Sequence, residues 1–146
     1  MNETTFRVRY GETDRMGVVY HTAYIDWFAI GRTEWLRDKG MSYRGAFEEE
    51  GLYLPVIRVE CTYKNSVTYD DPVTVRTTVE SFSPTRIRFR YRITGPAAIL
   101  AAEGITEHAF LDGRAGKPVN LQKARPELFE ALETIVASRP DESPRD

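Results

Sequence analysis

A change of hydrophobic period in the first half of the chain constrains the fold most strongly. From about Thr22 to Lys39, apolar residues recur every three or four positions, which is the spacing of one face of an α-helix. From Ile57 onward, apolar and polar residues alternate, as they do in strands that bury one face and expose the other. A long helix must bury its apolar stripe against another element, and the sheet offers an apolar face. The pattern predicts an α+β domain in which one sheet packs on one central helix.

The same patterns give approximate element boundaries. Gly40 follows the long helix and is placed to end it. Gly31, in the middle of that helix, costs about 1 kcal/mol relative to alanine, which predicts that another backbone approaches there. Residues 42–50 read as a short second helix or capped turn, and Pro126 starts a final helix to Ala137. The predicted strands cover residues 4–10, 57–64, 73–80, 86–93 and 98–111, the last four forming an antiparallel meander.

Composition excludes several classes of protein. The 146 residues suit a single domain, predicted over residues 4–137, followed by a disordered polar tail at 138–146. A net charge of −2 gives no broad basic field for nucleic acid. The single cysteine, Cys61, excludes an internal disulfide and a cysteine-rich metal site, and it fits a reducing compartment. No apolar run reaches membrane-spanning length and no signal peptide is evident, so we expect a cytoplasmic protein.

A loop between the first strand and the long helix is the best candidate for chemistry. Asp14 lies there, a few residues before the helix, whose first amides form a partial positive pole. Gly17 allows a tight turn or a close approach to a ligand. An acid beside such amides is a plausible acyl-transfer arrangement. The alternative is an Asx-type turn in which Asp14 only bonds its own loop.

Residues 12–24, which read ETDRMGVVYHTAY, resemble the signature of the 4-hydroxybenzoyl-CoA thioesterase family. They are most similar to its bacterial acyl-CoA thioesterase branch, encoded with the Tol-Pal cell-envelope genes. The similarity continues through Arg32–Arg37 and Tyr69–Pro72, and so covers roughly three quarters of the chain. The resemblance implies the hotdog fold, an antiparallel sheet wrapped around a long helix. It also implies an acyl-CoA thioesterase that works as a homodimer with the active site at the interface, with dimers pairing into a homotetramer.

The resemblance also implies roles for individual residues. Asp14 would attack the thioester carbonyl or activate a water that does so, and the two routes stay open. The backbone amides of Tyr20 and His21 would accept the charge that develops on the carbonyl oxygen. The His21 side chain would bond Asp14 or the substrate, orient a water, or only cap the helix. No metal or cofactor is expected, because coenzyme A is part of the substrate and the two histidines lie far apart.

Substrate contacts are predicted in three parts of the chain. In the loop, Thr13 and Gly17 are candidates together with Val18. Tyr24 either lines the acyl pocket or seals the helix against the sheet. Further along, a row of arginines at 86, 88, 90 and 92 marks either a solvated sheet face or a clamp for the phosphates of coenzyme A. The first choice for that clamp is Arg86, with Lys64 and Asn65 as supports and Thr85 as a further substrate contact. His108 is expected to be structural.

Two other functional classes remain open from the sequence. One is a hotdog module that binds acyl-CoA without cleaving it, and the other is a partner protein of a cell-envelope complex. The sequence also leaves open the length and type of the acyl group. It leaves open as well whether the thioester is carried by coenzyme A or by acyl-carrier protein.

Overall fold

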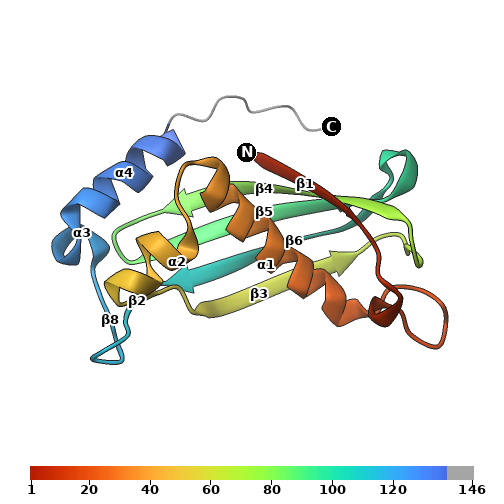
Figure 1. The fold of residues 1–146 in the computed structure, drawn as a ribbon, viewed down its shortest axis with the longest axis horizontal. Coiled ribbons are helices and arrows are strands. Elements are labelled where there is room, and N and C mark those ends of the chain that lie inside the picture. Colours follow the sequence, from red (N-terminus) through yellow and green to blue (C-terminus); the bar gives the residue numbers. More distant parts are fainter. Residues whose placement is uncertain (138–146) are drawn as a thin grey trace.

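A five-stranded antiparallel sheet with one long helix across it dominates the computed structural model, which describes residues 1–137 (Figure 1). The predicted tail at 138–146 lies outside the described residues. The strands follow one another across the sheet in the order β1-β4-β5-β6-β3. Their bounds are β1 Asn2–Arg7, β3 Val56–Tyr63, β4 Pro72–Phe82, β5 Arg86–Thr94 and β6 Leu100–Ala109.

The helix α1, His21–Asp38, buries the face that the sequence predicts. Trp27 and Phe28 are fully buried, and the Phe28 ring stacks on that of Tyr91 in β5 with 4.3 Å between ring centroids. The alternation in β5 is equally regular, since Ile87, Phe89, Tyr91 and Ile93 are buried toward the helix. The predicted α+β fold, with one sheet and one central helix, is confirmed.

The predicted meander is correct for β4, β5 and β6 but wrong for β3. This strand pairs with β6 at the far edge of the sheet, and β1 takes the place beside β4. The reason lies in residues 64–71, which join β3 to β4. They cross past the start of α1, with Val67 buried and Thr68 bridged to Val18. This crossing carries the chain from β3, at one edge of the sheet, to β4, which lies beside β1 at the other edge.

Short elements complete the described chain. The first strand ends at Arg7 rather than at residue 10, because the chain then turns into a 3₁₀ helix. The predicted segment 42–50 splits in two, and a short helix precedes the predicted final one. The short elements are η1 Tyr10–Glu12, α2 Tyr43–Ala46, η2 Glu48–Glu50, β2 Leu52–Tyr53, η3 Pro96–Ala98, β7 Leu111–Asp112, β8 Lys117–Pro118, α3 Leu121–Ala124 and α4 Pro126–Ala137.

At Gly31, α1 packs closely against the sheet. A Cβ built on it would lie 2.4 Å from Thr77 Oγ1 and 2.8 Å from Val75 Cγ1, both distances too short for real contacts. The close approach is as expected, but the atoms met are side-chain atoms of β4 rather than the predicted backbone.

Gly31→Ala is therefore expected to destabilise the fold although alanine is the better helix former. Relieving the overlap with Thr77 and Val75 costs about 2–3 kcal/mol, whereas the higher helix propensity of alanine stabilises the helix by about 1 kcal/mol. Urea denaturation followed by circular dichroism should show a net loss of about 1–2 kcal/mol. Gly11→Ala is the matched control, because nothing lies within 4 Å of a Cβ built there. Equal stability of the two variants would contradict this packing.

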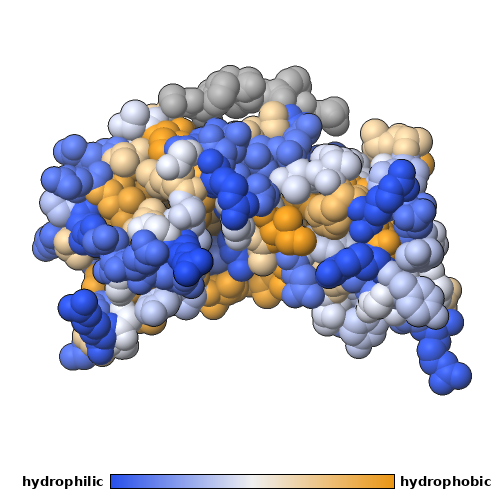
Figure 2. All heavy atoms as spheres, viewed as in Figure 1, coloured by the Kyte–Doolittle hydropathy of each residue, from blue (hydrophilic) through white to orange (hydrophobic). Residues whose placement is uncertain are grey.

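Strand β3 forms an apolar edge. Val56, Ile57, Val59 and Tyr63 are each 43–46% exposed, and one edge of β3 has no neighbouring strand within residues 1–137. The face that carries α1 shows orange apolar patches among blue charged ones (Figure 2). Exposed strand edges of this kind are templates for pairing with another chain. Within residues 1–137, none of the helices is both long and apolar enough to span a membrane.

Candidate active site

The loop between β1 and α1 folds back on itself as a narrow hairpin. Thr13 and Val19 form an antiparallel bridge, and the Asp14 amide donates to the Val18 carbonyl at 2.9 Å. Gly17, at φ 81°, makes the turn and donates to the Asp14 carbonyl at 2.9 Å. Pairing places Asp14 opposite Val18, three residues before His21. Val18 precedes the helix start by about 10 Å of extended chain, so the hairpin holds Asp14 closer to the helix than the roughly 23 Å of extended chain between Asp14 and His21.

Asp14 forms the Asx-type turn that the sequence analysis kept as an alternative. Its Oδ1 accepts from the Met16 amide at 2.8 Å. Among the hydrogen bonds of residues 1–137, Oδ2 has no donor, and the side chain is only half-buried. The turn fixes one carboxylate oxygen and leaves the other available, so the Asx turn is compatible with a chemical role.

The amides at the start of α1 require one correction. The Tyr20 amide, predicted as an oxyanion donor, already donates to the Glu12 carbonyl at 2.8 Å. It closes the hairpin and is unavailable for a substrate. The His21 amide, in the first helical position, has no acceptor within the described part of the chain. The donor role therefore falls to His21 alone of the predicted pair.

Glu12 organises the loop, a role that the sequence analysis did not find. Its Oε1 accepts from the Arg9 amide at 2.7 Å, and its Oε2 accepts from the Trp27 indole at 3.0 Å and from the Arg9 guanidinium at 3.0 Å. Burial raises the pKa of Glu12, but these hydrogen bonds outweigh burial and hold the pKa below its ordinary value of 4.5. The carboxylate thus joins the loop to the core through a fully buried tryptophan.

Glu12→Gln is expected to destabilise the protein by about 2 kcal/mol at pH 7, because the buried Trp27 N–H loses a charged acceptor. Since the folded-state pKa is lowered, this contribution is present above pH 4.5 and is lost as the pH falls through the folded value. Urea denaturation of the wild type and Glu12→Gln should give a difference in the free energy of unfolding that is largest at pH 7 and becomes smaller below pH 4.5. The exposed Glu130→Gln is the control, and an equal, pH-independent loss in both variants would argue against this role.

The aromatic side chains around the helix start fall into two groups. Tyr24 is 3% exposed and packs edge-on against Trp27 and Tyr63, so it seals the helix against the sheet as in the core alternative. The Tyr20 and His21 rings are exposed and lie 4.5 Å apart. The predicted bond from the imidazole to Asp14 is absent among the hydrogen bonds of residues 1–137. Tyr63 was not predicted, yet its hydroxyl donates to the His21 carbonyl at 2.9 Å and ties β3 to the helix start.

The remaining predicted substrate residues lie at opposite ends of the sheet. Lys64 directly follows Tyr63, so it lies at the same end as the Asp14 loop, and it is exposed. Thr85 and Arg86 lie at the β4–β5 turn, at the end of β5 that pairs with Ala109. Strand β4 is 11 residues long, which puts this turn about 35 Å from the loop end. Within one chain, the structure does not bring Thr85 and Arg86 to Asp14.

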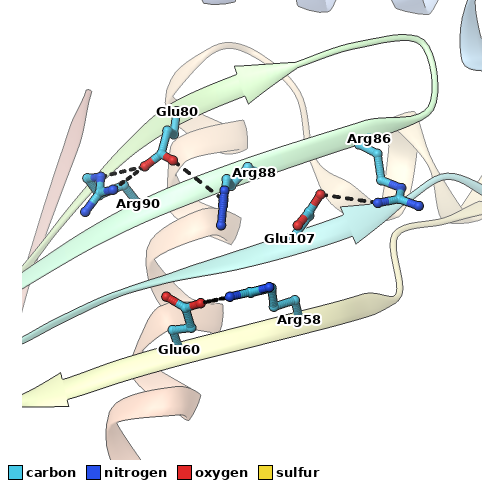
Figure 3. Close-up of polar contacts among 7 residues, drawn as sticks. All are labelled: Arg58, Glu60, Glu80, Arg86, Arg88, Arg90 and Glu107. Carbon is cyan, nitrogen blue, oxygen red and sulfur yellow. Dashed lines mark hydrogen bonds and ion pairs between the residues drawn. The ribbon is translucent and has the colours of Figure 1, made fainter.

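The arginine row lies on the sheet face that points away from α1, where carboxylates accompany it (Figure 3). Arg86 contacts Glu107 at 3.3 Å, and Arg92 contacts Glu103 at 3.2 Å. Arg88 and Arg90 share Glu80. Each arginine of the row has an acidic partner on a neighbouring strand, which favours the solvated-face interpretation over a phosphate clamp.

His108 is structural, as expected. It is fully buried, with Nδ1 3.0 Å from the Leu54 carbonyl and Nε2 2.9 Å from Thr106 Oγ1. Burial lowers the pKa of His108 to about 4, so the ring is neutral at pH 7. No cluster of three metal-ligating side chains occurs in residues 1–137. Within residues 1–137, the loop thus carries an acid with one unengaged oxygen and leads into a helix whose first amide is unengaged, and these two groups suit attack on a carbonyl carbon.

A family model and several known proteins are similar to the chain over most of its length. The model of the "Thioesterase-like superfamily" matches residues 8–132. The "Putative acyl-CoA thioesterase YneP" of Bacillus subtilis is 32% identical over 133 residues, 91% of this chain and 96% of that protein. The "Acyl-CoA thioesterase YbgC" of Haemophilus influenzae is 31% identical over 126 residues, 86% and 92% of the two chains. A solved structure of the 1,4-dihydroxy-2-naphthoyl (DHNA)-CoA thioesterase of Staphylococcus aureus is 35% identical with a TM-score of 0.87, covering 92% of this chain and 90% of that one.

Proposed function

Because the chain belongs to the thioesterase-like superfamily and has its hotdog fold, we propose that it hydrolyses the thioester bond of acyl-CoA. Water is consumed, and a carboxylic acid and free coenzyme A are released. The prediction of a thioester hydrolase is confirmed by the family and by the thioesterases among the similar proteins. The acyl-CoA substrate follows from the names of two relatives and from the resemblance of residues 12–24.

One observation carries the proposed mechanism. The hairpin fixes Asp14 through Oδ1 and the backbone while Oδ2 and the His21 amide stay unengaged. A thioester carbon between them would meet a carboxylate on one side while its oxygen accepts a hydrogen bond from the amide. Asp14 acts as nucleophile, forming a mixed anhydride that water opens, or as general base toward water. Oxygen-18 from labelled water should enter the Asp14 side chain in a single turnover only by the first route.

We further propose a homodimer built on the edge of β3. The exposed apolar side chains of β3 would be covered, and the unpaired strand edge would be satisfied by a two-fold related copy. A two-fold axis pairs the strand antiparallel, so the Tyr63 end of one copy meets the Val56 end of the other. This arrangement also brings the end of the sheet that holds Thr85 and Arg86 toward the partner's Asp14 loop. Sedimentation should give twice the chain's 16.7 kDa, and a monomer at micromolar concentration would contradict the dimer. Pairing of dimers into a tetramer stays a prediction.

Thiol release from a panel of acyl-CoAs tests the activity itself. The panel should contain aliphatic chains of two to twelve carbons together with 4-hydroxybenzoyl-CoA and 1,4-dihydroxy-2-naphthoyl-CoA. The pair Tyr20-His21 favours the Tol-Pal-linked branch, so we expect the highest kcat/KM on short or medium aliphatic chains. Tight binding of the panel without any thiol release would show a binding module instead.

A further inference from the structure

A cavity of about 200 Å³ opens on the flank of α1, apart from the Asp14 loop. It lies three helical turns from the helix start, about 16 Å along the axis between His21 and Arg32. Leu36 and Phe89 are buried at its floor, whereas its other lining residues are only partly buried. The lining consists of Arg32, Thr33, Leu36, Tyr43, Leu54 and Phe89.

Arg32 brings a positive charge into this cavity without a carboxylate beside it. The side chain is half-buried, and no ion pair within residues 1–137 includes it. Its one hydrogen bond, to the Tyr91 hydroxyl, is long at 3.5 Å. That hydroxyl is already engaged with Thr106 Oγ1 at 2.7 Å. A half-buried guanidinium without a counter-ion carries a desolvation cost that a bound anion would offset.

The Tyr43 hydroxyl of the cavity is also suited to donate a hydrogen bond to a bound ligand. The Tyr43 hydroxyl accepts from the Leu54 amide at 3.1 Å, so its own proton is free to be donated. Burial raises the pKa of Tyr43, which keeps that proton in place. Among residues 1–137, no acidic side chain lines the cavity. Leu36, Leu54 and Phe89 supply apolar walls beside these two donors.

We propose that this cavity binds the carboxylate of a small organic acid, with Arg32 and Tyr43 donating to its oxygens and the apolar walls covering its carbon chain. A cavity of about 150 Å³ accommodates benzene, so 200 Å³ suits a body of about six carbons. Arg32 is then the residue that selects ligands with a negative charge over uncharged ligands of equal length.

Such a carboxylate has two possible sources. One is the far end of a dicarboxylic acyl group on coenzyme A, an assignment that rests on the proposed function. In the β3-paired dimer the partner's helix start approaches the Val56 end of this chain, two residues from Leu54 in the cavity wall. The other source is a free carboxylic acid, which requires no catalysis.

Kinetics and calorimetry on the whole protein distinguish these sources. The kinetic arm compares kcat/KM for adipyl-CoA and hexanoyl-CoA, which differ by a carboxylate at the sixth carbon. The calorimetric arm titrates hexanoate. Both arms use the wild type, Arg32→Met, Arg32→Lys and the control Arg37→Met, which removes an exposed arginine of the same helix that pairs with Glu34. Circular dichroism establishes folding, and Arg32→Lys preserves the charge if Arg32→Met is unstable.

If the far end of the acyl group is the source, the kcat/KM of the wild type is at least tenfold higher for adipyl-CoA than for hexanoyl-CoA. Arg32→Met then lowers that ratio at least tenfold, Arg32→Lys lowers it less, and Arg37→Met leaves it unchanged. If the free acid is the source, the ratio stays constant while Arg32→Met weakens hexanoate binding at least tenfold. The proposal is overturned if folded Arg32→Met and Arg32→Lys have the same kcat/KM ratio and the same hexanoate affinity as the wild type. It is also overturned if the wild type neither prefers adipyl-CoA over hexanoyl-CoA nor binds hexanoate. If the wild type hydrolyses neither adipyl-CoA nor hexanoyl-CoA, the proposed function is refuted. This inference is then decided by calorimetry alone, that is, by whether Arg32→Met weakens hexanoate binding at least tenfold.

Discussion

Asp14→Asn is expected to lower kcat for acyl-CoA hydrolysis about 1,000-fold while the protein keeps its fold. General bases contribute about 100- to 10,000-fold in other enzymes, and an amide is neither a base nor a competent nucleophile. The substitution is nearly isosteric, and its side-chain oxygen can still accept from the Met16 amide, so the hairpin should persist.

The measurement is thiol release at saturating acyl-CoA, with melting temperatures of both proteins. Asp26→Asn is the matched control, because it removes an exposed carboxylate from the first turns of α1. A loss below tenfold for Asp14→Asn, or an equal loss for Asp26→Asn, would remove Asp14 from the reaction.

The second large effect is expected from His21→Pro, which deletes the unengaged amide of the helix start. Proline suits the first helical position because its φ is already helical and the missing N–H has no acceptor there. The preceding residue must be extended, and Tyr20 already is, at φ −70° and ψ 142°. Loss of one oxyanion donor should lower kcat about 100- to 1,000-fold.

His21→Ala separates the amide from the imidazole. It keeps the backbone donor and removes only the exposed ring, so we expect a loss of less than tenfold. An equal loss in His21→Ala and His21→Pro would assign the role to the ring, because both substitutions remove it. Circular dichroism at 222 nm should show unchanged helix content in both variants.

The sequence predicted the parts of the fold that depend on periodicity. The helix at 22–39 and the strands near 57–64, 73–80 and 86–93 are within about three residues of the observed ones, because each has a regular apolar period. All of them except β3 bury that apolar face. The place of β3 was not predictable from local pattern, since strand order depends on where the chain crosses. The apolar residues of β3 alternate like those of a central strand, yet they are exposed at an edge.

The residues of the candidate site also fall into those that local pattern predicted and those that it did not. Asp14 and Gly17 were found because a carboxylate and a glycine before a helix have a local physical meaning. Glu12 was missed as the organiser of the loop, since its contact with Trp27 spans 15 residues. The engagement of the Tyr20 amide depends on the hairpin pairing, which no single residue indicates. Arg32 was noted only as part of a family segment, because its missing counter-ion is visible only in three dimensions.

The most direct test of the central claim is a double-mutant cycle on thiol release with Asp14→Asn, His21→Pro and both together. If the carboxylate and the amide act on the same thioester carbonyl, their losses are not additive, as in other catalytic units. The double variant should then be at most about tenfold slower than Asp14→Asn alone. Full multiplication of the two losses, or a double variant as active as the wild type, would contradict the account.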